Sequence, residues 1–365
     1  MTTAPGPAPS ASMVRDAARG LSPAYFALVM ATGIVSLAAH QLGLARIAEG
    51  LFWLNVAAYV VIWLLTVLRV AWYPRELWRD LVDHRRGPGF FNTVAASSVL
   101  ATQFALLAHD YVTAKLLWVV AVALWAGLTY AVFAAFTVKR EKPPLEEGVS
   151  GTWLLAVVAM QSIAVLSACL AAQPGEPHRL VLDFLALAMW LAGGMLYIWT
   201  ISLIFYRTTF FRFAPADLTP PYWISMGAMA ISTLAGSFLI LNARDAPFLA
   251  SLLPFLEGFT VFYWATGTWW IPLLVVLAVW RHAYARFPLR YDPSSWGAVF
   301  PLGMYAACTF EMARAMELDF LAGVPRGFFY VALAAWALAF AGVVRALAAA
   351  VVRRFNRAFR RAAGG

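Results

Sequence analysis

The chain is divided into ten apolar stretches of roughly twenty residues, each long enough to cross a hydrocarbon core of about 30 Å as a helix. We place these spans at residues 22–43, 51–71, 90–108, 114–138, 151–172, 180–206, 221–242, 252–280, 294–316 and 327–351. Runs such as residues 116–138 are apolar on every face, whereas the strands of a membrane β-barrel alternate apolar and polar residues. The sequence therefore predicts an all-α integral membrane protein with ten transmembrane helices.

Composition supports this prediction and argues against other classes. Of the 365 residues, 62% are hydrophobic and 12% are charged, about half the charged fraction of a soluble domain. The net charge of +9 does not indicate a nucleic-acid partner, because the arginines flank membrane helices and face anionic lipid. Cys169 and Cys308 lie inside apolar spans, and the five histidines lack ligand spacing, so we expect neither a metal nor a cofactor. Enzyme motifs are absent too, which predicts that the chain is not an enzyme.

The basic residues predict the orientation of the chain. Of 27 lysines and arginines, all but six lie in the terminal segments or in the loops after the second, fourth, sixth and eighth spans. The six exceptions are Arg46, Lys115, Arg179, Arg244, Arg314 and Arg326. Basic residues of short loops stay cytoplasmic, so both termini are expected in the cytoplasm, with the protein in the plasma (inner) membrane. We expect residues 1–20 to be a disordered tail, residues 21–352 the transmembrane domain and residues 353–365 a basic tail.

The odd-numbered spans share an opening motif. In four of the five, a proline lies three residues before an aromatic residue, and Ser150 replaces the proline in the fifth span. The aromatic residues are Phe26, Phe91, Trp153, Trp223 and Trp296. This spacing indicates a repeated unit of two helices. Five such hairpins around an axis would place the odd helices at the centre, where they can line a pore, and the even helices towards lipid.

The two sets of helices also differ in side-chain size. Even spans are rich in tryptophan, whereas odd spans carry small and weakly polar residues, which permit close helix packing or leave space beside it. We take seven of them as candidates for lining a pore: Thr32, Gly33, Ser97, Ser98, Gly227, Ser232 and Gly303. Charged residues are nearly absent from the middles of the odd spans. We interpret Glu257, Glu311 and Arg314 as side chains near helix ends that reach towards water.

One sequence inside the ninth span departs from ordinary helix chemistry. Pro301 removes a backbone hydrogen bond and bends the helix, and Gly303 loosens it further. Such a bend redirects neighbouring side chains. Phe300 is therefore either a hydrophobic plug in a central path or a packed core residue beside the bend.

Four stretches of the chain resemble the tellurite-resistance/dicarboxylate transporter family, which includes slow-type anion channels: residues 25–36, 222–236, 257–282 and 296–309. The resemblance covers the chain after residue 20. It implies ten helices as five hairpins in a quasi-five-fold arrangement, a trimer, and a gating phenylalanine on the ninth helix, for which Phe300 is the matching position. The chain departs from the family in having a deep proline only in the ninth span.

These observations together predict transport of small anions across the membrane. The resemblance leaves open a C4-dicarboxylate such as malate, an inorganic anion, or efflux of sulfite or tellurite, because one scaffold serves several substrates. It also leaves open a channel or a proton-coupled carrier. A membrane scaffold without transport and an intramembrane enzyme are the alternatives from other classes.

Overall fold

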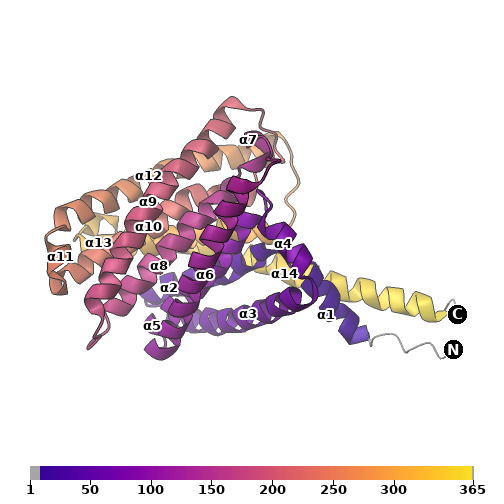
Figure 1. The fold of residues 1–365 in the computed structure, drawn as a ribbon, viewed down its shortest axis with the longest axis horizontal. Helices are drawn as coiled ribbons and strands as arrows, with labels where there is room; N and C mark the ends of the chain where they lie inside the picture. Colours follow the sequence, from indigo (N-terminus) through magenta and orange to yellow (C-terminus); the bar gives the residue numbers. More distant parts are fainter. Residues whose placement is uncertain (1–8, 364–365) are drawn as a thin grey trace.

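Ten long helices occupy the predicted spans in the computed structural model, which describes residues 9–363 (Figure 1). The odd spans form α2 (Phe26–Gln41), α5 (Asn92–Leu106), α8 (Leu155–Ala171), α10 (Ile224–Asn242) and α13 (Trp296–Ala315). The even spans form α3 (Ala45–Trp72), α6 (Tyr111–Val138), α9 (Arg179–Phe210), α12 (Leu253–Val279) and α14 (Gly323–Ala363). The described residues contain no strand, so the predicted all-α class is confirmed.

The five odd helices form a closed ring. Along the chain each packs against the next, and α13 returns to pack against α2. Each is also packed against the even helix that follows it, as expected for five hairpins. We call the odd helices the inner helices and the even helices the outer helices.

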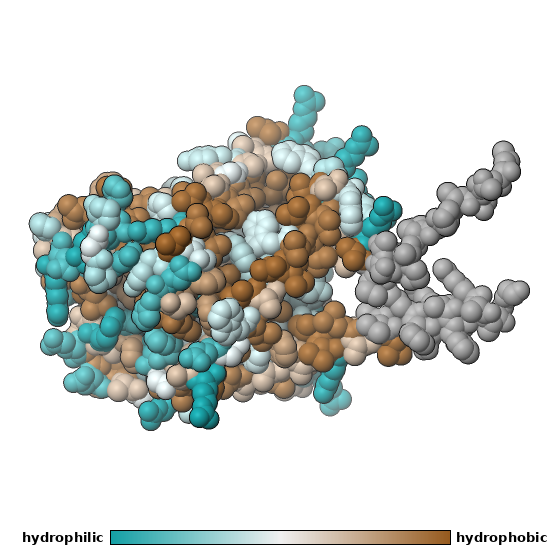
Figure 2. Space-filling model, turned by 90° about the horizontal axis from the view of Figure 1, so that it is seen from below, coloured by the Kyte–Doolittle hydropathy of each residue, from teal (hydrophilic) through white to brown (hydrophobic). Residues whose placement is uncertain are grey.

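Burial separates the two sets as cleanly as position does. Large exposed hydrophobic side chains lie on all five outer helices and on none of the inner ones, within the described residues. Leu64, Tyr130, Trp199 and Leu338 are examples, each at least 60% exposed. Figure 2 shows hydrophobic side chains over much of one face, with hydrophilic ones towards its edges. Such a belt is stable only when lipid covers it, and the chain is therefore an integral membrane protein.

Eight of the ten long helices are long and apolar enough to span a membrane, in the part of the chain that the structure describes. The two that fall short are α5 and α13, both inner helices. Their sequences carry polar groups such as Gln103 and Glu311, which other helices surround. An inner helix meets protein on all sides and has less need of an apolar surface. The count of ten membrane spans stays a prediction.

Each inner helix begins in the same way. A 3₁₀ turn precedes each of them, at Pro23–Tyr25, Gly87–Phe91, Gly151–Leu154, Pro220–Trp223 and Pro293–Ser295. Four of these turns contain the proline of the sequence motif near their start, where its missing N–H costs no helical hydrogen bond. Side chains cap two of the five turns, from Ser22 and Asp292.

Both ends of the described chain are helical. Residues Pro9–Arg19 form a helix, α1, instead of the disordered tail expected for residues 1–20. Helix α1 packs on α3, and Ala18 is fully buried there, so a contact with the domain supplies the stability that this sequence lacks alone. At the other end α14 continues to Ala363, so most of the basic tail predicted at 353–365 prolongs that helix. Residues 1–8 lie outside the described part.

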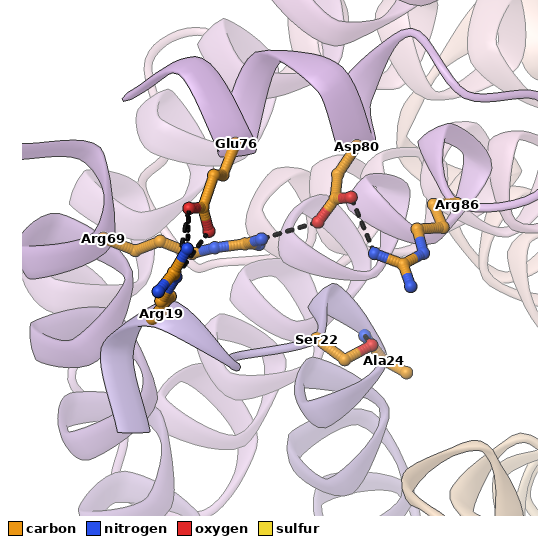
Figure 3. A network of polar contacts seen from close by, with 7 residues as sticks. All are labelled: Arg19, Ser22, Ala24, Arg69, Glu76, Asp80 and Arg86. Atoms are coloured by element: carbon orange, nitrogen blue, oxygen red, sulfur yellow. Dashed lines mark hydrogen bonds and ion pairs between the residues drawn. The ribbon is translucent and has the colours of Figure 1, made fainter. Parts of the chain in front are cut away.

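A network of charged side chains joins α1, the end of α3 and the short helix α4 (Pro74–Leu81) (Figure 3). Asp80 accepts hydrogen bonds from Arg69 at 2.5 Å and from Arg86 at 2.8 Å. Glu76 accepts from Arg19 at 2.8 Å. Burial raises the pKa of Asp80, but the hydrogen bonds from the two arginines outweigh it, and the pKa lies below its ordinary value.

We predict that Asp80→Asn lowers the free energy of unfolding by roughly 3 kcal/mol, because it leaves the buried Arg69 guanidinium without its carboxylate. Denaturation of the purified protein in detergent measures this change. The exposed pair of Arg19 and Glu76 supplies the control, and Glu76→Gln should have little effect. Equal effects of the two substitutions would contradict the prediction.

The same ion pairs predict a pH dependence. Because the folded state lowers the pKa of Asp80, its stabilisation is fully present above the ordinary pKa of an aspartate. It is lost as the pH falls through the lowered pKa. The difference in stability between the wild type and Asp80→Asn should therefore be constant near neutral pH and shrink in strong acid. A difference that grows in acid would contradict this assignment.

Candidate functional site

Three small cavities follow one another along the axis of the inner ring. The first, which we call the amino-terminal cavity, lies where the inner helices begin; it measures about 50 Å³ and has wall residues from all five. The middle cavity, of about 20 Å³, is also lined by all five. The third, of about 20 Å³, is lined by α2, α5, α10 and α13. Since one water needs roughly 10–15 Å³, the axis is hollow but interrupted.

The lining residues show how the five repeats correspond. The middle cavity includes one residue from each helix at the same level, namely Ile34, Val99, Ser162, Ile231 and Met304. Seven positions earlier lie Ala27, Asn92, Leu155, Ile224 and Gly297, all of which line the amino-terminal cavity. These levels are in register if Leu154, and not Trp153, is the counterpart of Phe26.

The sequence alignment of the third hairpin was therefore wrong by one residue. Trp153 does not occupy the position of the other four aromatic residues. Its indole donates hydrogen bonds to the carbonyl oxygens of His84 at 3.0 Å and Gly148 at 2.9 Å, which fasten the loops before α5 and α8. Because Trp153 is bonded to these loops, Leu154 takes the position that Phe26 and its counterparts occupy in the other repeats.

Phe300 borders the axis between two of the cavities. Together with Met30 of α2 it lines the amino-terminal cavity, and both residues are only 1% exposed. The next residues inward on the same two helices, Met304 and Ile34, already line the middle cavity. Phe300 and Met30 thus lie at the level where the two cavities are separated.

Pro301 and Gly303 do not face the axial space but the neighbouring helices. A Cβ atom on Gly227 of α10 would lie 2.7 Å from the Cγ of Pro301, so the missing side chain makes room for the proline ring. A Cβ on Gly303 would lie 3.0 Å from Ile34 of α2. Both glycines allow α13 to approach its two neighbours in the ring.

Of the seven candidates for lining a pore, Ser98 lines an axial cavity. Ser97 lies within hydrogen-bond distance, 2.8 Å, of the Tyr59 hydroxyl of α3. Gly33 faces Val99 of α5 and the buried amide of Asn55 of α3. Gly227 and Gly303 pack against helices as described, and the remaining two candidates, Thr32 and Ser232, contact outer helices. These six residues contact neighbouring helices, and their assignment to a pore lining stays a prediction.

Polar contacts between outer and inner helices explain why these residues are small and polar. In all five hairpins, an aromatic side chain of the outer helix forms a hydrogen bond to the inner helix that comes next around the ring. The pairs are Tyr59 with Ser97 at 2.8 Å, Trp118 with Ser167 at 2.8 Å, Trp190 with the Ser232 carbonyl at 2.8 Å, Trp264 with Thr309 at 3.0 Å and Trp336 with Thr32 at 3.0 Å. Four inner-helix hydroxyls and the backbone carbonyl of Ser232 thus partner aromatic N–H and O–H groups that would be costly to bury alone.

Within the five inner helices, sequence reasoning missed three polar residues that line the amino-terminal or middle cavity: Asn92, Thr102 and Ser162. A signal for them exists in the sequence. Asn92 and Thr102 lie one and eleven residues after Phe91, and Ser162 lies eight residues after Leu154. Residues at the same offsets in other inner helices also line the axis. The one-residue error in the third hairpin concealed this pattern for Ser162.

A wider pocket, of about 360 Å³, lies at the opposite end, where the inner helices finish. Its wall includes Arg314 and Arg326, and Gln41 belongs both to this pocket and to the third axial cavity. Gln41 donates to Glu311 at 2.8 Å, and Glu311 pairs with Arg314 at 2.6 Å. Glu311 is 5% exposed, so it is a buried, paired carboxylate and not a side chain that reaches water as we interpreted it from the sequence.

We predict that Gly227→Ala lowers stability by about 1–3 kcal/mol, because the added methyl group must displace Pro301 or its helix. The melting temperature of the detergent-solubilised protein reports this effect. Gly127 of α6 is a matched control, since a Cβ there meets no atom within 4 Å. Gly127→Ala should leave the melting temperature unchanged or raise it. A harmless Gly227→Ala would show that α10 and α13 are not held in close contact.

Comparison with known proteins agrees with this architecture. An uncharacterized membrane protein of Mycobacterium tuberculosis is 40% identical over 158 residues, which cover 43% of this chain and 80% of that protein. An uncharacterized transporter of Methanocaldococcus jannaschii is 24% identical over 330 residues, with 88% of this chain and 92% of that protein covered. A sulfite efflux pump of Candida albicans is 20% identical over 333 residues, or 83% of this chain and 68% of that protein.

Several of these relatives are named as transporters or efflux pumps and none as an enzyme, among the proteins compared here. The family model described as voltage-dependent anion channel matches residues 20–344, which include all ten long helices up to the middle of α14. The ring of inner helices, the apolar belt and this match lead to one conclusion: the chain belongs to the voltage-dependent anion channel family, whose members transport anions across membranes.

Proposed function

We propose that small anions pass along the axis of the inner ring, through the three cavities, and that Phe300 is the gate. The observation that carries the proposal is the interruption of the axial space at Phe300 and Met30, with cavities on both sides. Both side chains are unbranched at Cβ and turn by rotation about χ1 and χ2. A rotation of one aromatic ring can join two cavities without moving a helix.

The chemistry of the walls favours weak and permissive binding. No lysine, arginine, aspartate or glutamate lines the amino-terminal or middle cavity, within the described residues. The lining combines aliphatic side chains with hydroxyl and amide groups. An anion here would meet hydrogen-bond donors without forming an ion pair, and so would leave as readily as it enters.

The substrate class is proposed from the relatives. Sulfite is the anion that the efflux pumps are named for, and it is a candidate here beside malate, chloride, nitrate and tellurite. We propose a location in the plasma (inner) membrane with both termini in the cytoplasm, since most of the basic loops lie at the end where the inner helices begin. We also propose a homotrimer, which native mass spectrometry in detergent would refute by showing only monomer.

We expect Phe300→Ala to increase anion current in planar bilayers roughly tenfold or more over the wild type, since a barrier lowered by about 1.4 kcal/mol already gives that factor. Phe26→Ala is the matched control. Phe26 is equally buried on an inner helix, but its ring contacts Trp63 of α3 instead of the axis. That variant should lose stability without gaining current.

The alternative outcomes separate the remaining mechanisms. If Phe300→Ala stays silent while proteoliposomes take up sulfite or malate with saturation, the protein is a carrier and Phe300 is not its gate. If uptake collapses when the proton gradient is removed, the carrier is proton-coupled. If no anion moves in either assay, the transport proposal fails and the scaffold hypothesis is favoured.

A further inference from the structure

The five repeats share one further axial level, beyond the middle cavity, and it carries a charge. Counted from Phe26, Phe91, Leu154, Trp223 and Trp296, the fifteenth following residues are Gln41, Leu106, Cys169, Phe238 and Glu311. Three of them, Gln41, Leu106 and Phe238, line the third axial cavity. Offsets of one, four, eight and eleven residues define the earlier levels, and among the described residues at all of these offsets Glu311 is the one charged side chain. A carboxylate at this place repels an anion strongly, because little water screens it.

The two oxygens of Glu311 have different surroundings. The side chain is 5% exposed, and its Oε1 accepts a hydrogen bond from Gln41 at 2.8 Å. Arg314 lies 2.6 Å from Oε2 as an ion pair, but Oε2 accepts no hydrogen bond from any residue that the structure describes. Oε2 is therefore a buried oxygen that depends on the charge of Arg314 and is able to take a proton.

Arg314 is the partner that can leave this pair. Its side chain is 56% exposed, whereas that of Glu311 is 7% exposed. Arg314 and Arg326 both belong to the wall of the wider pocket of about 360 Å³, and Gln41 connects that wall with the third axial cavity. Two guanidinium groups in one wall attract an anion, and an exposed arginine exchanges one partner for another at little cost.

The loss of Arg314 would leave Glu311 as a buried charge without compensation. A buried carboxylate is stable when it is paired or when it is neutral, and an isolated one is costly. An anion that pairs with Arg314 in the wider pocket therefore favours the protonated form of Glu311. The Glu311–Arg314 pair is neutral before the exchange. Arg314 with its anion, beside the protonated Glu311, is neutral after it.

Few other groups near this end of the axis can titrate instead. The ionisable side chains that line the adjoining cavities or interact electrostatically with Glu311 are His40 of α2, Cys169 of α8, Asp319 of the turn after α13 and Arg326 of α14. Arg244, Asp245 and Glu317 are exposed and belong to neither wall, and Asp245 pairs with Arg179 at 3.1 Å. Because Cys169 is buried and an arginine stays charged, His40 and Asp319 are the groups that a test must separate from Glu311.

We infer that Glu311 binds a proton when an anion draws Arg314 into the wider pocket, so that one anion and one proton are loaded together at this end of the axis. The proton comes from the water of the wider pocket, and the O–H of Glu311 is the one covalent bond that forms. The protonated side chain no longer repels the anion as it enters the third cavity. This inference rests on the proposed function, because it places the exchange at one end of the proposed path.

The first test measures chloride current in planar bilayers through the Phe300→Ala variant. Chloride itself does not titrate, so a change with pH reports the protein. We expect the current to rise about tenfold as the pH of both chambers falls from ~7.5 to ~5, a range between the ordinary state of a paired glutamate and its protonation. Glu311→Gln in the same background imitates the neutral side chain and should conduct at the higher level at both pH values.

His40→Gln and Asp319→Asn are the matched controls, since each removes another titratable group that lines an adjoining cavity. Both should keep the rise in acid. If Phe300→Ala conducts and Glu311→Gln still shows the rise, Glu311 is not the proton site, while the transport proposal stands. A current through Phe300→Ala that is the same at both pH values also overturns the inference.

A second readout needs no flux. Sodium chloride added to the wild-type protein in weakly buffered detergent solution near neutral pH should cause the uptake of up to about one proton per chain, read with a pH indicator. Glu311→Gln should lose this uptake. Arg314→Gln, a change at a half-exposed side chain, should lose it too, because the carboxylate then has no partner to give up.

These outcomes decide the proton site independently of conduction. If Phe300→Ala is silent, the transport proposal fails, and the uptake of protons alone decides the site. A wild type that takes up no proton refutes the inference without any variant. An uptake that survives in Glu311→Gln belongs to another group and refutes it as well.

Discussion

Hydrogen bonds from each outer helix to the next inner helix are the contacts on which the ring depends. In a membrane, apolar surfaces gain nothing from leaving lipid, so association of helices relies on close packing and on polar pairs that have no other partner. Trp118, Trp190, Trp264 and Trp336 each reach across to a neighbouring hairpin in this way, and Tyr59 does the same in the first hairpin. The contact of Trp336 with Thr32 joins α14 to α2 and so connects the fifth hairpin to the first. Five hairpins linked in this manner can enclose an axis.

The same contacts leave the axis almost free of charge. Four inner-helix hydroxyls partner the outer helices, and the axial cavities are lined mainly by aliphatic side chains with a few polar groups. Charged pairs lie towards the two ends, where Asp80 holds two arginines and Glu311 holds Arg314. A neutral, narrow interior suits an ion that must enter and leave quickly, since a buried ion pair would hold it in place.

Much of the fold could be predicted from the sequence, because membrane helices are recognised by the length and hydropathy of their segments. The long helices occupy the predicted spans, and the hairpin repeat placed the inner set correctly. Prediction was weaker where a residue has two uses. Thr32 and Gly33 have the size and polarity of pore-lining residues, and the same properties suit a helix contact. Only the direction of each side chain separates these uses, and a helix with almost no hydrophobic periodicity gives no sign of that direction.

The sequence by itself determined the class of the protein, the number of long helices and the presence of a five-fold repeat, because each depends on local composition and on spacing along the chain. Tertiary structure decided which residues face the axis, since that depends on how five helices rotate to satisfy their neighbours. It shifted the third repeat from Trp153 to Leu154, buried Glu311 beside Gln41, and brought Asn92 and Phe300, more than two hundred residues apart in the sequence, to the same cavity. The physical reason is that a contact between distant helices is a property of the assembled ring, and no single span contains it.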